Sequence, residues 1–145
     1  MNKRNRFGFV RILLWGLGLA SSVGALQASD DDRQCSNATL TGSYGLHATG
    51  NIIGIGDFAA VGLFTFDGKG HLTGKLFIRE NGTNLGPNEF TGTYVVNPDC
   101  TVQDAWDGAT HVSVIVNRGN GYLILNNTVG AGNTISGEAK KLFPE

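Results

Sequence analysis

The sequence predicts an all-β domain, a small antiparallel barrel of eight strands, behind an N-terminal signal peptide. Three observations lead to this prediction. Apolar and polar residues alternate with a period of two rather than about 3.6, which is typical of strands with one buried face. Short clusters of Gly, Asn, Asp and Pro separate these runs at the spacing of hairpin turns. Glycines also recur inside the runs, which indicates strongly coiled strands.

The chain begins with the three parts of a secretory signal peptide. Residues 1–11 carry four basic side chains, residues 12–20 form an uncharged, largely apolar run, and small residues follow, with cleavage points after Ala25 and Ala28. The run is shorter than the roughly 20 apolar residues that a membrane anchor needs. We therefore predict a signal peptide over residues 1–28 and a secreted or periplasmic protein.

Cleavage after Ala28 turns a nearly neutral chain into an acidic domain. The leader holds four of the 11 Lys and Arg residues and none of the 12 Asp and Glu residues, so the remainder has a net charge of −5. This charge argues against nucleic acid and anionic membranes as partners, because both are bound by concentrated Lys and Arg. Residues 29–37 are predicted to be an acidic disordered tail, and residues 38–145 are predicted to form one barrel domain.

Two cysteines, Cys35 and Cys100, are the only ones in the chain. An even number in an exported protein favours a disulfide over two free thiols. Two cysteines so far apart have no metal-ligand spacing, so the sequence predicts no metal site.

Eight alternating runs account for nearly all of the domain. They cover approximately residues 38–49, 56–66, 71–80, 88–97, 101–106, 110–118, 121–128 and 133–142. The sharpest turn is predicted at 67–70, and a looser loop at 81–88. The alternation assigns the following side chains to buried faces: Phe64, Phe66, Leu72, Leu76, Ile78, Phe90, Tyr94, Val96, Val112, Val114, Val116, Tyr122, Ile124 and Asn126.

The repeated glycines inside the runs favour a closed barrel. A glycine inside a strand weakens it unless the backbone bends or another chain segment comes close. Closure of eight hairpin-linked strands would also remove the exposed sheet edges. A two-sheet sandwich remains the alternative.

Three blocks of sequence carry a family resemblance. The first, residues 35–46, reads Cys-x-x-Ala-Thr-Leu-x-Gly-Ser-Tyr-Gly-Leu, and the second, residues 65–74, reads Thr-Phe-Asp-Gly-x-Gly-x-Leu-x-Gly. The third, residues 91–101, reads Thr-Gly-Thr-Tyr-x-Val-Asn-x-Asp-Cys-Thr. Together they resemble a group of small exported bacterial proteins of uncharacterised role. The strand count and hairpin order also resemble barrels of the allene oxide cyclase, dirigent and lipocalin type. This second resemblance implies a shape only, because no catalytic residue can be carried over and the lipocalin Gly-x-Trp signature is absent.

No catalytic or cofactor motif is present. His47 and His111 are expected on the polar faces of their strands, and His71 is expected in solvent beside a turn. No serine lies in a Gly-x-Ser-x-Gly elbow, and no glycine-rich loop is followed by the Lys and helix of a phosphate site. The following carboxylates are expected to be surface charges: Asp57, Glu80, Glu89, Asp104, Asp107 and Glu138. The sequence therefore predicts no cofactor.

Aromatic side chains on the buried faces suggest a function. An eight-stranded barrel encloses either packed side chains or one small ligand. The candidate ligand-contacting residues are Phe64, Phe66, Phe90, Tyr94, Trp106 and Tyr122. The leading hypothesis is a non-enzymatic exported barrel that binds a small apolar molecule or has an envelope or surface role. The alternative is a small isomerase or cyclase that holds its substrate inside the barrel, which requires an inward carboxylate, His or Tyr.

Overall fold

The computed structural model describes residues 34–128 and 132–143. The chain divides into two compact units, and all the described residues belong to the second, Asp32–Glu145. The predicted signal peptide, residues 1–28, lies outside the described residues.

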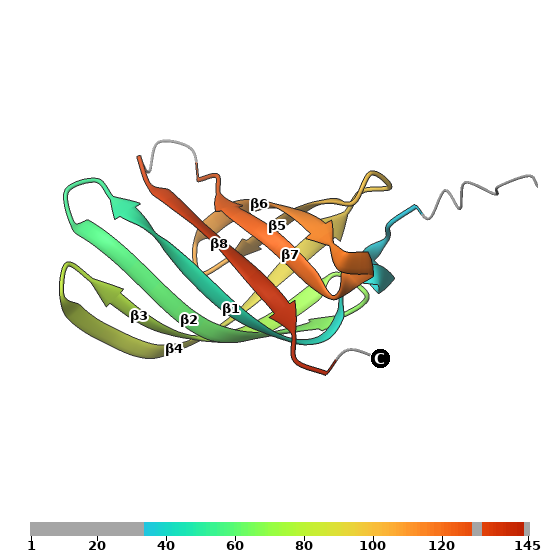
Figure 1. Cartoon of the computed structure of the whole chain (residues 1–145), viewed down its shortest axis with the longest axis horizontal. Helices are drawn as coiled ribbons and strands as arrows, with labels where there is room; N and C mark the ends of the chain where they lie inside the picture. Colours follow the sequence, from blue (N-terminus) through green and yellow to red (C-terminus); the bar gives the residue numbers. More distant parts are fainter. Residues whose placement is uncertain (1–33, 129–131, 144–145) are drawn as a thin grey trace, which may run out of the picture. The chain divides into compact units, whose positions relative to one another are not determined.

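Eight antiparallel strands form one closed barrel in simple chain order, which confirms the predicted fold (Figure 1). The strands are β1 (Thr41–Ile52), β2 (Gly56–Asp67), β3 (His71–Glu80), β4 (Thr83–Val96), β5 (Thr101–Trp106), β6 (Ala109–Val116), β7 (Gly121–Asn126) and β8 (Thr134–Lys141). Two single-turn 3-10 helices accompany them, η1 (Asn37–Thr39) and η2 (Asn117–Gly119).

The first and last strands close the barrel by pairing with each other. β1 and β8 are antiparallel and in register from Tyr44, opposite Lys141, to Asn51, opposite Thr134. Every strand therefore has two hydrogen-bonded neighbours. This closure excludes the alternative of a two-sheet sandwich. β4 extends past the end of β5, so its residues before Gly92 pair only with β3.

Two inward-facing glycines lie where neighbouring strands come closest. A Cβ atom on Gly137 of β8 would collide with the carbonyl oxygen of His47 in β1, and one on Gly62 of β2 would collide with that of Lys75 in β3. At a third position, Gly74, the ring of Phe90 on the paired strand covers the glycine. The glycines inside the strands thus allow the close approach and coiling that closure needs.

The turn between β2 and β3 lies where the sequence predicts it, and Asp67 holds it. Its Oδ1 atom accepts hydrogen bonds from the backbone N–H groups of Lys69, Gly70 and His71, at 2.7, 3.0 and 3.0 Å. The donors at His71 and Lys69 contribute most to holding the pKa of the Asp67 carboxyl below its usual range, because they stabilise the ionised form.

The predicted loop at 81–88 is not a loop. β4 begins at Thr83, directly after a two-residue turn in which Asn81 and Gly82 both have positive φ, as a type I′ hairpin turn requires. The pairing register of β3 and β4 shifts between Leu76 and Ile78, opposite the segment that contains Pro87. The proline lies at this irregularity, where a strand tolerates a missing N–H.

The predicted disulfide is confirmed. Cys35 and Cys100 are bonded, with their Cα atoms 4.9 Å apart and a sequence separation of 65. The backbone N–H of Cys35 also donates a hydrogen bond to the carbonyl oxygen of Pro98. Residues 35–37, which the sequence placed in the acidic tail, are therefore held against the turn between β4 and β5.

This N-terminal segment closes one end of the barrel. Leu40 follows η1 and is almost completely buried. The Tyr94 hydroxyl inside the barrel donates to the carbonyl oxygen of Leu40 at 3.0 Å, and the Tyr44 hydroxyl donates to that of Gly119 in η2. We call this the closed end. The turns β1–β2, β3–β4 and β5–β6 lie at the opposite end, which we call the open end (Figure 1).

A cavity at the open end of the barrel

The six aromatic residues that the sequence nominated all face the interior, but they lie at two levels. Near the closed end Phe66 packs edge-to-face with Tyr44, Tyr94 and Tyr122, and Tyr44 also packs on Tyr122, with ring centroids 5.0 to 5.7 Å apart. Phe64, Phe90 and Trp106 form the next level, where Trp106 stacks on Phe90 at 4.7 Å. Only Trp106 of the six lines the cavity at the open end of the barrel. The other five are packed core side chains.

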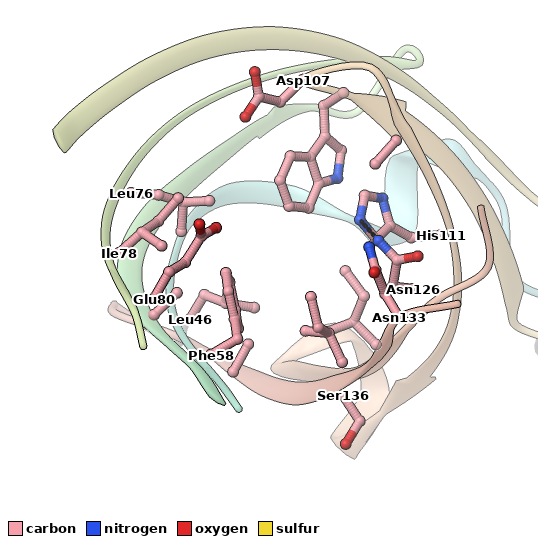
Figure 2. Close-up of a pocket in the computed structure, with 16 residues that line it drawn as sticks. Leu46, Phe58, Leu76, Ile78, Glu80, Asp107, His111, Asn126, Asn133 and Ser136 are labelled. Atoms are coloured by element: carbon pink, nitrogen blue, oxygen red, sulfur yellow. Dashed lines mark hydrogen bonds between the residues drawn. The ribbon is translucent and has the colours of Figure 1, made fainter. Parts of the chain in front are cut away.

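The interior beyond this aromatic layer is hollow. A cavity of about 240 Å³ lies at the open end (Figure 2). Most of its wall is apolar and consists of Leu46, Ala48, Phe58, Ala60, Leu76, Ile78, Trp106, Ala109, Ile124 and Ile135. Its polar lining residues are Glu80, Asp107, His111, Asn126, Asn133 and Ser136.

Small inward residues create this hollow. Ala48 of β1 and Ala60 of β2 are direct cross-strand partners, and both are buried. Gly137 of β8 faces inward beside them, opposite Ala48. Toward the closed end β1 and β2 carry the much larger inward side chains Tyr44 and Phe66. The interior is therefore filled at the level of these rings and hollow at the level of Ala48, Ala60 and Gly137.

β6 faces the opposite way from the prediction. His111, Ser113 and Ile115 are the buried residues of this strand, whereas Val114 faces outward and is 44 % exposed. The assignment of the valines to the interior was wrong because periodicity alone does not say which face of a strand is inside. The register with β5 settles it: His111 lies opposite Asp104, and the two polar side chains meet inside the barrel.

Asp104 is the centre of a buried polar cluster, and its assignment to the surface was also wrong. Its Oδ1 atom accepts a hydrogen bond from Nε1 of Trp106 at 2.6 Å and lies 3.1 Å from Nδ1 of His111. Its Oδ2 atom accepts a hydrogen bond from the hydroxyl of Ser113 at 3.3 Å. The Asp104 and His111 side chains are both 5 % exposed. These partners compensate the loss of water around the carboxylate.

The neighbours of His111 indicate which ring nitrogen carries the proton. The backbone N–H of Thr128 donates to Oδ1 of Asn126 at 3.1 Å, which turns the Asn126 amide nitrogen toward Nε2 of His111, 3.5 Å away. An amide N–H₂ group only donates, so Nε2 is the acceptor. The proton of the neutral ring then lies on Nδ1, beside the Asp104 carboxylate. This Nδ1 contact is close but lacks the alignment of a hydrogen bond.

Trp106 fixes the plane of the imidazole. The two rings are stacked with centroids 4.1 Å apart and an angle of 10° between their planes. Asp104 accepts the hydrogen bond of the indole nitrogen and also lies beside Nδ1 of His111, so the carboxylate contacts both rings. His111 is thus packed between Trp106 and Asp104 in the cavity wall.

The Tyr122 hydroxyl lies deeper in the interior and has no hydrogen-bond partner. Burial raises the pKa of Tyr122 well above its usual value, and the charge of Asp104 and the neighbouring Tyr44 add to the shift. The hydroxyl therefore stays protonated and neutral at all physiological pH values.

The charged groups around the cavity are acidic. Glu80 and Asp107 lie at its rim, and Asp104 lies behind its wall. Figure 2 shows Glu80 on the side opposite His111, Asn126 and Asn133. None of the lining residues is Lys or Arg. The cavity is therefore electrostatically unfavourable for an anion and open to neutral or cationic molecules.

The remaining polar candidates lie on the outside. His47 is exposed on the outer wall, as expected. His71 lies in solvent with Nδ1 3.3 Å from Oδ2 of Asp67. Glu89 and Glu138 are also exposed, and each lies beside a lysine. The structure therefore brings together Asp104, Trp106, His111 and Asn126. Glu80 and Asp107 line the same cavity, and the other titratable candidates lie outside it.

No family model matches the chain, and neither a curated protein nor a solved structure matches it. Within residues 34–128 and 132–143, no three His, Cys, Asp or Glu side chains are grouped so that they could hold a metal ion. The same part of the chain contains no helix with the length and apolar character needed to span a bilayer.

Proposed function

We propose that this protein is an exported binding protein that holds one small, largely apolar molecule in the open-end cavity. The observation that carries the proposal is the cavity itself, which is apolar over most of its wall and has its polar groups at the rim and beside His111. Binding sites for small molecules generally combine an apolar wall with a few polar groups that fix the orientation of the ligand.

The size of the cavity limits the ligand. An apolar protein cavity of about 150 Å³ holds one benzene molecule, and this cavity measures about 240 Å³. A substituted single ring, a compact two-ring compound or a short branched chain fits this space. Long fatty acids and large cofactors do not fit within it.

The charge around the cavity limits the ligand further. The carboxylates of Glu80 and Asp107 at the rim repel an anionic group, and no lining Lys or Arg compensates them. The ligand is therefore neutral or cationic, and its polar end meets the side of the cavity that carries His111 and Asn126.

Export is supported by the leader-like sequence of residues 1–28 and by the disulfide, which persists in oxidising compartments. When the full chain is expressed in a secreting bacterium, we expect the exported protein to begin at Leu26 or Ser29. N-terminal sequencing measures this directly. An exported protein that still begins at Met1 would contradict the cleavable leader.

Binding is tested with toluene, benzylamine and benzoate, three compounds of similar size that are neutral, cationic and anionic. We expect toluene and benzylamine to bind at least about tenfold more tightly than benzoate, a difference of about 1.4 kcal/mol. Titration calorimetry measures the affinities. Trp106 provides a second readout, because it lines the cavity and is the only tryptophan after the leader.

A matched pair of variants locates the binding site. Ala60→Phe places a ring in the cavity and should abolish binding of toluene, whereas Ala59→Phe places the same ring on the outer face of β2 and should not. Thermal unfolding confirms that each variant is folded. Unchanged toluene binding in the folded Ala60→Phe variant would rule out this cavity. If none of the three compounds binds, the proposal fails and the envelope or surface role remains.

A further inference from the structure

We propose that His111, held by Asp104, is a general base that transfers a proton within a small carbonyl compound bound in the cavity. The reaction class is the shift of a carbon–carbon double bond into conjugation with a ketone. This inference rests on the proposed binding function, because the substrate must first enter the cavity.

The first argument is the direction in which the imidazole presents its basic nitrogen. Nδ1 faces the Asp104 carboxylate at 3.1 Å, and Nε2 faces Asn126 at the side of the cavity. A carboxylate behind one imidazole nitrogen holds the tautomer whose other nitrogen accepts protons, and it stabilises the imidazolium that forms. The base is thus prepared without any movement of the strands.

The second argument is that the contact between Nε2 and Asn126 is weak. At 3.5 Å it is at the limit of a hydrogen bond, so a substrate can displace it at small cost. Because Thr128 continues to hold Oδ1 of Asn126, the amide N–H₂ group stays beside the imidazole. It is a neutral donor beside Nε2, and it can donate to the oxygen of a substrate carbonyl.

The third argument is the apolar surroundings. His111 stacks on Trp106, and most of the cavity wall is aliphatic or aromatic. Fixed donors stabilise a developing oxyanion more strongly where water is excluded than in solution. The acidic rim also favours a neutral substrate over an anionic one, in agreement with the ligand class proposed above.

The proton balance of the step needs no other reactant. Nε2 of His111 removes a proton from the carbon between the carbonyl and the double bond. The electron pair of that C–H bond becomes a double bond to the carbonyl carbon, and the carbonyl π pair moves to the oxygen, which gives a dienolate. The imidazolium then returns the proton from Nε2 to the far carbon of the original double bond, whose π pair forms the new C–H bond. The dienolate double bond shifts to the α,β position as the electron pair on the oxygen re-forms the carbonyl. Asp104 remains a carboxylate throughout and acts as a positioning residue.

The test uses the processed, disulfide-bonded protein and the β,γ-unsaturated isomer of cyclohexenone. Formation of the conjugated ketone is followed by ultraviolet absorbance, and binding of the ketone is measured separately by saturation-transfer NMR. We expect the protein to accelerate the reaction at least about 100-fold over the same concentration of free imidazole. The His111→Gln variant should bind the ketone but react at the background rate. His47→Gln, on the outer wall, should react like the unsubstituted protein.

Asp104→Asn separates positioning from a structural role. It removes the carboxylate beside Nδ1 and keeps the shape of the side chain. We expect the plateau rate to fall and the preference for the Nδ1–H tautomer, measured by nitrogen NMR of the imidazole, to be lost. A structural defect alone would lower the rate and leave the tautomer preference in place.

The outcomes distinguish the two proposals. Ketone binding without acceleration overturns the proton-transfer inference and leaves the binding function standing. Acceleration that survives in folded His111→Gln and His111→Asn variants overturns the assignment to His111. Absence of ketone binding in the unsubstituted protein counts against both.

Discussion

Replacing both cysteines, as Cys35→Ser with Cys100→Ser, should lower the free energy of unfolding by about 4 kcal/mol. The disulfide closes a loop of 65 positions, and a loop of that length restricts the unfolded chain by about this amount in the chain-entropy model. Few single features of a domain this size contribute as much, because total stability is commonly only 5–15 kcal/mol.

Urea unfolding followed by circular dichroism measures this change, with the unsubstituted protein in reducing buffer as the matched control. The turn between β4 and β5 has its own hydrogen bonds, including those from the Thr101 backbone and side chain to Asp99. We therefore expect it to keep its conformation, while residues 35–40 lose their attachment. A loss below about 1 kcal/mol would show that the disulfide does not restrict the unfolded chain as the model assumes.

Phe66→Ala should be as damaging, with a loss of about 3–5 kcal/mol. Phe66 is 5 % exposed and lies among three tyrosine rings, Tyr44, Tyr94 and Tyr122, each in edge-to-face contact with it. Removing its ring forfeits the burial of that side chain and these contacts, and it leaves a void that the rigid barrel cannot fill.

Phe77→Ala is the matched control for this prediction. It removes the same atoms from β3, but Phe77 faces outward and is 51 % exposed. Its loss should cost less than about 1 kcal/mol, as exposed substitutions commonly do. Equal losses at the two positions, measured by urea unfolding, would contradict the assignment of Phe66 to the core and of Phe77 to the outer wall.

The sequence is sufficient to predict the strands and their order, because the signals for these are local. Alternation and the turn at 67–70 place β2 and β3 within a residue of their observed bounds. Closure is indicated by glycines such as Gly137, whose missing side chain permits close strand contact. The position of β4 was harder, because the Asn81–Gly82 turn was hidden in a segment rich in Gly, Asn and Pro that also suggests a loop.

The candidate site could not be predicted in the same way. Whether His111 or Val112 faces inward depends on pairing with β5 and β7, which is not a property of β6 alone. β6 carries apolar residues on both faces, so its own pattern does not decide which face points into the barrel. The face with His111 points inward, where His111 contacts Asp104. Asn126 was correctly assigned to the interior, since Tyr122 and Ile124 precede it in the same phase.

The cavity also depends on side-chain volume, which a pattern of apolar and polar residues does not record. Ala48 and Ala60 are apolar and buried, but a pattern of apolar and polar residues does not weigh their volume against that of Tyr44 or Phe66. Only the register shows that two small residues face each other. A pattern that sums side-chain volume at each level of the barrel would have found the hollow.

The closed end also determines where a fusion partner or a solid support can be joined to the barrel. β1 begins there and β8 ends there, so both ends of the barrel chain leave on the side away from the cavity (Figure 1). A tether joined to either end, whether a fusion partner or a solid support, would leave the ligand entrance free. The same arrangement makes the turns at the open end, such as Asp107–Gly108, available for redesign without disturbing the attachment point.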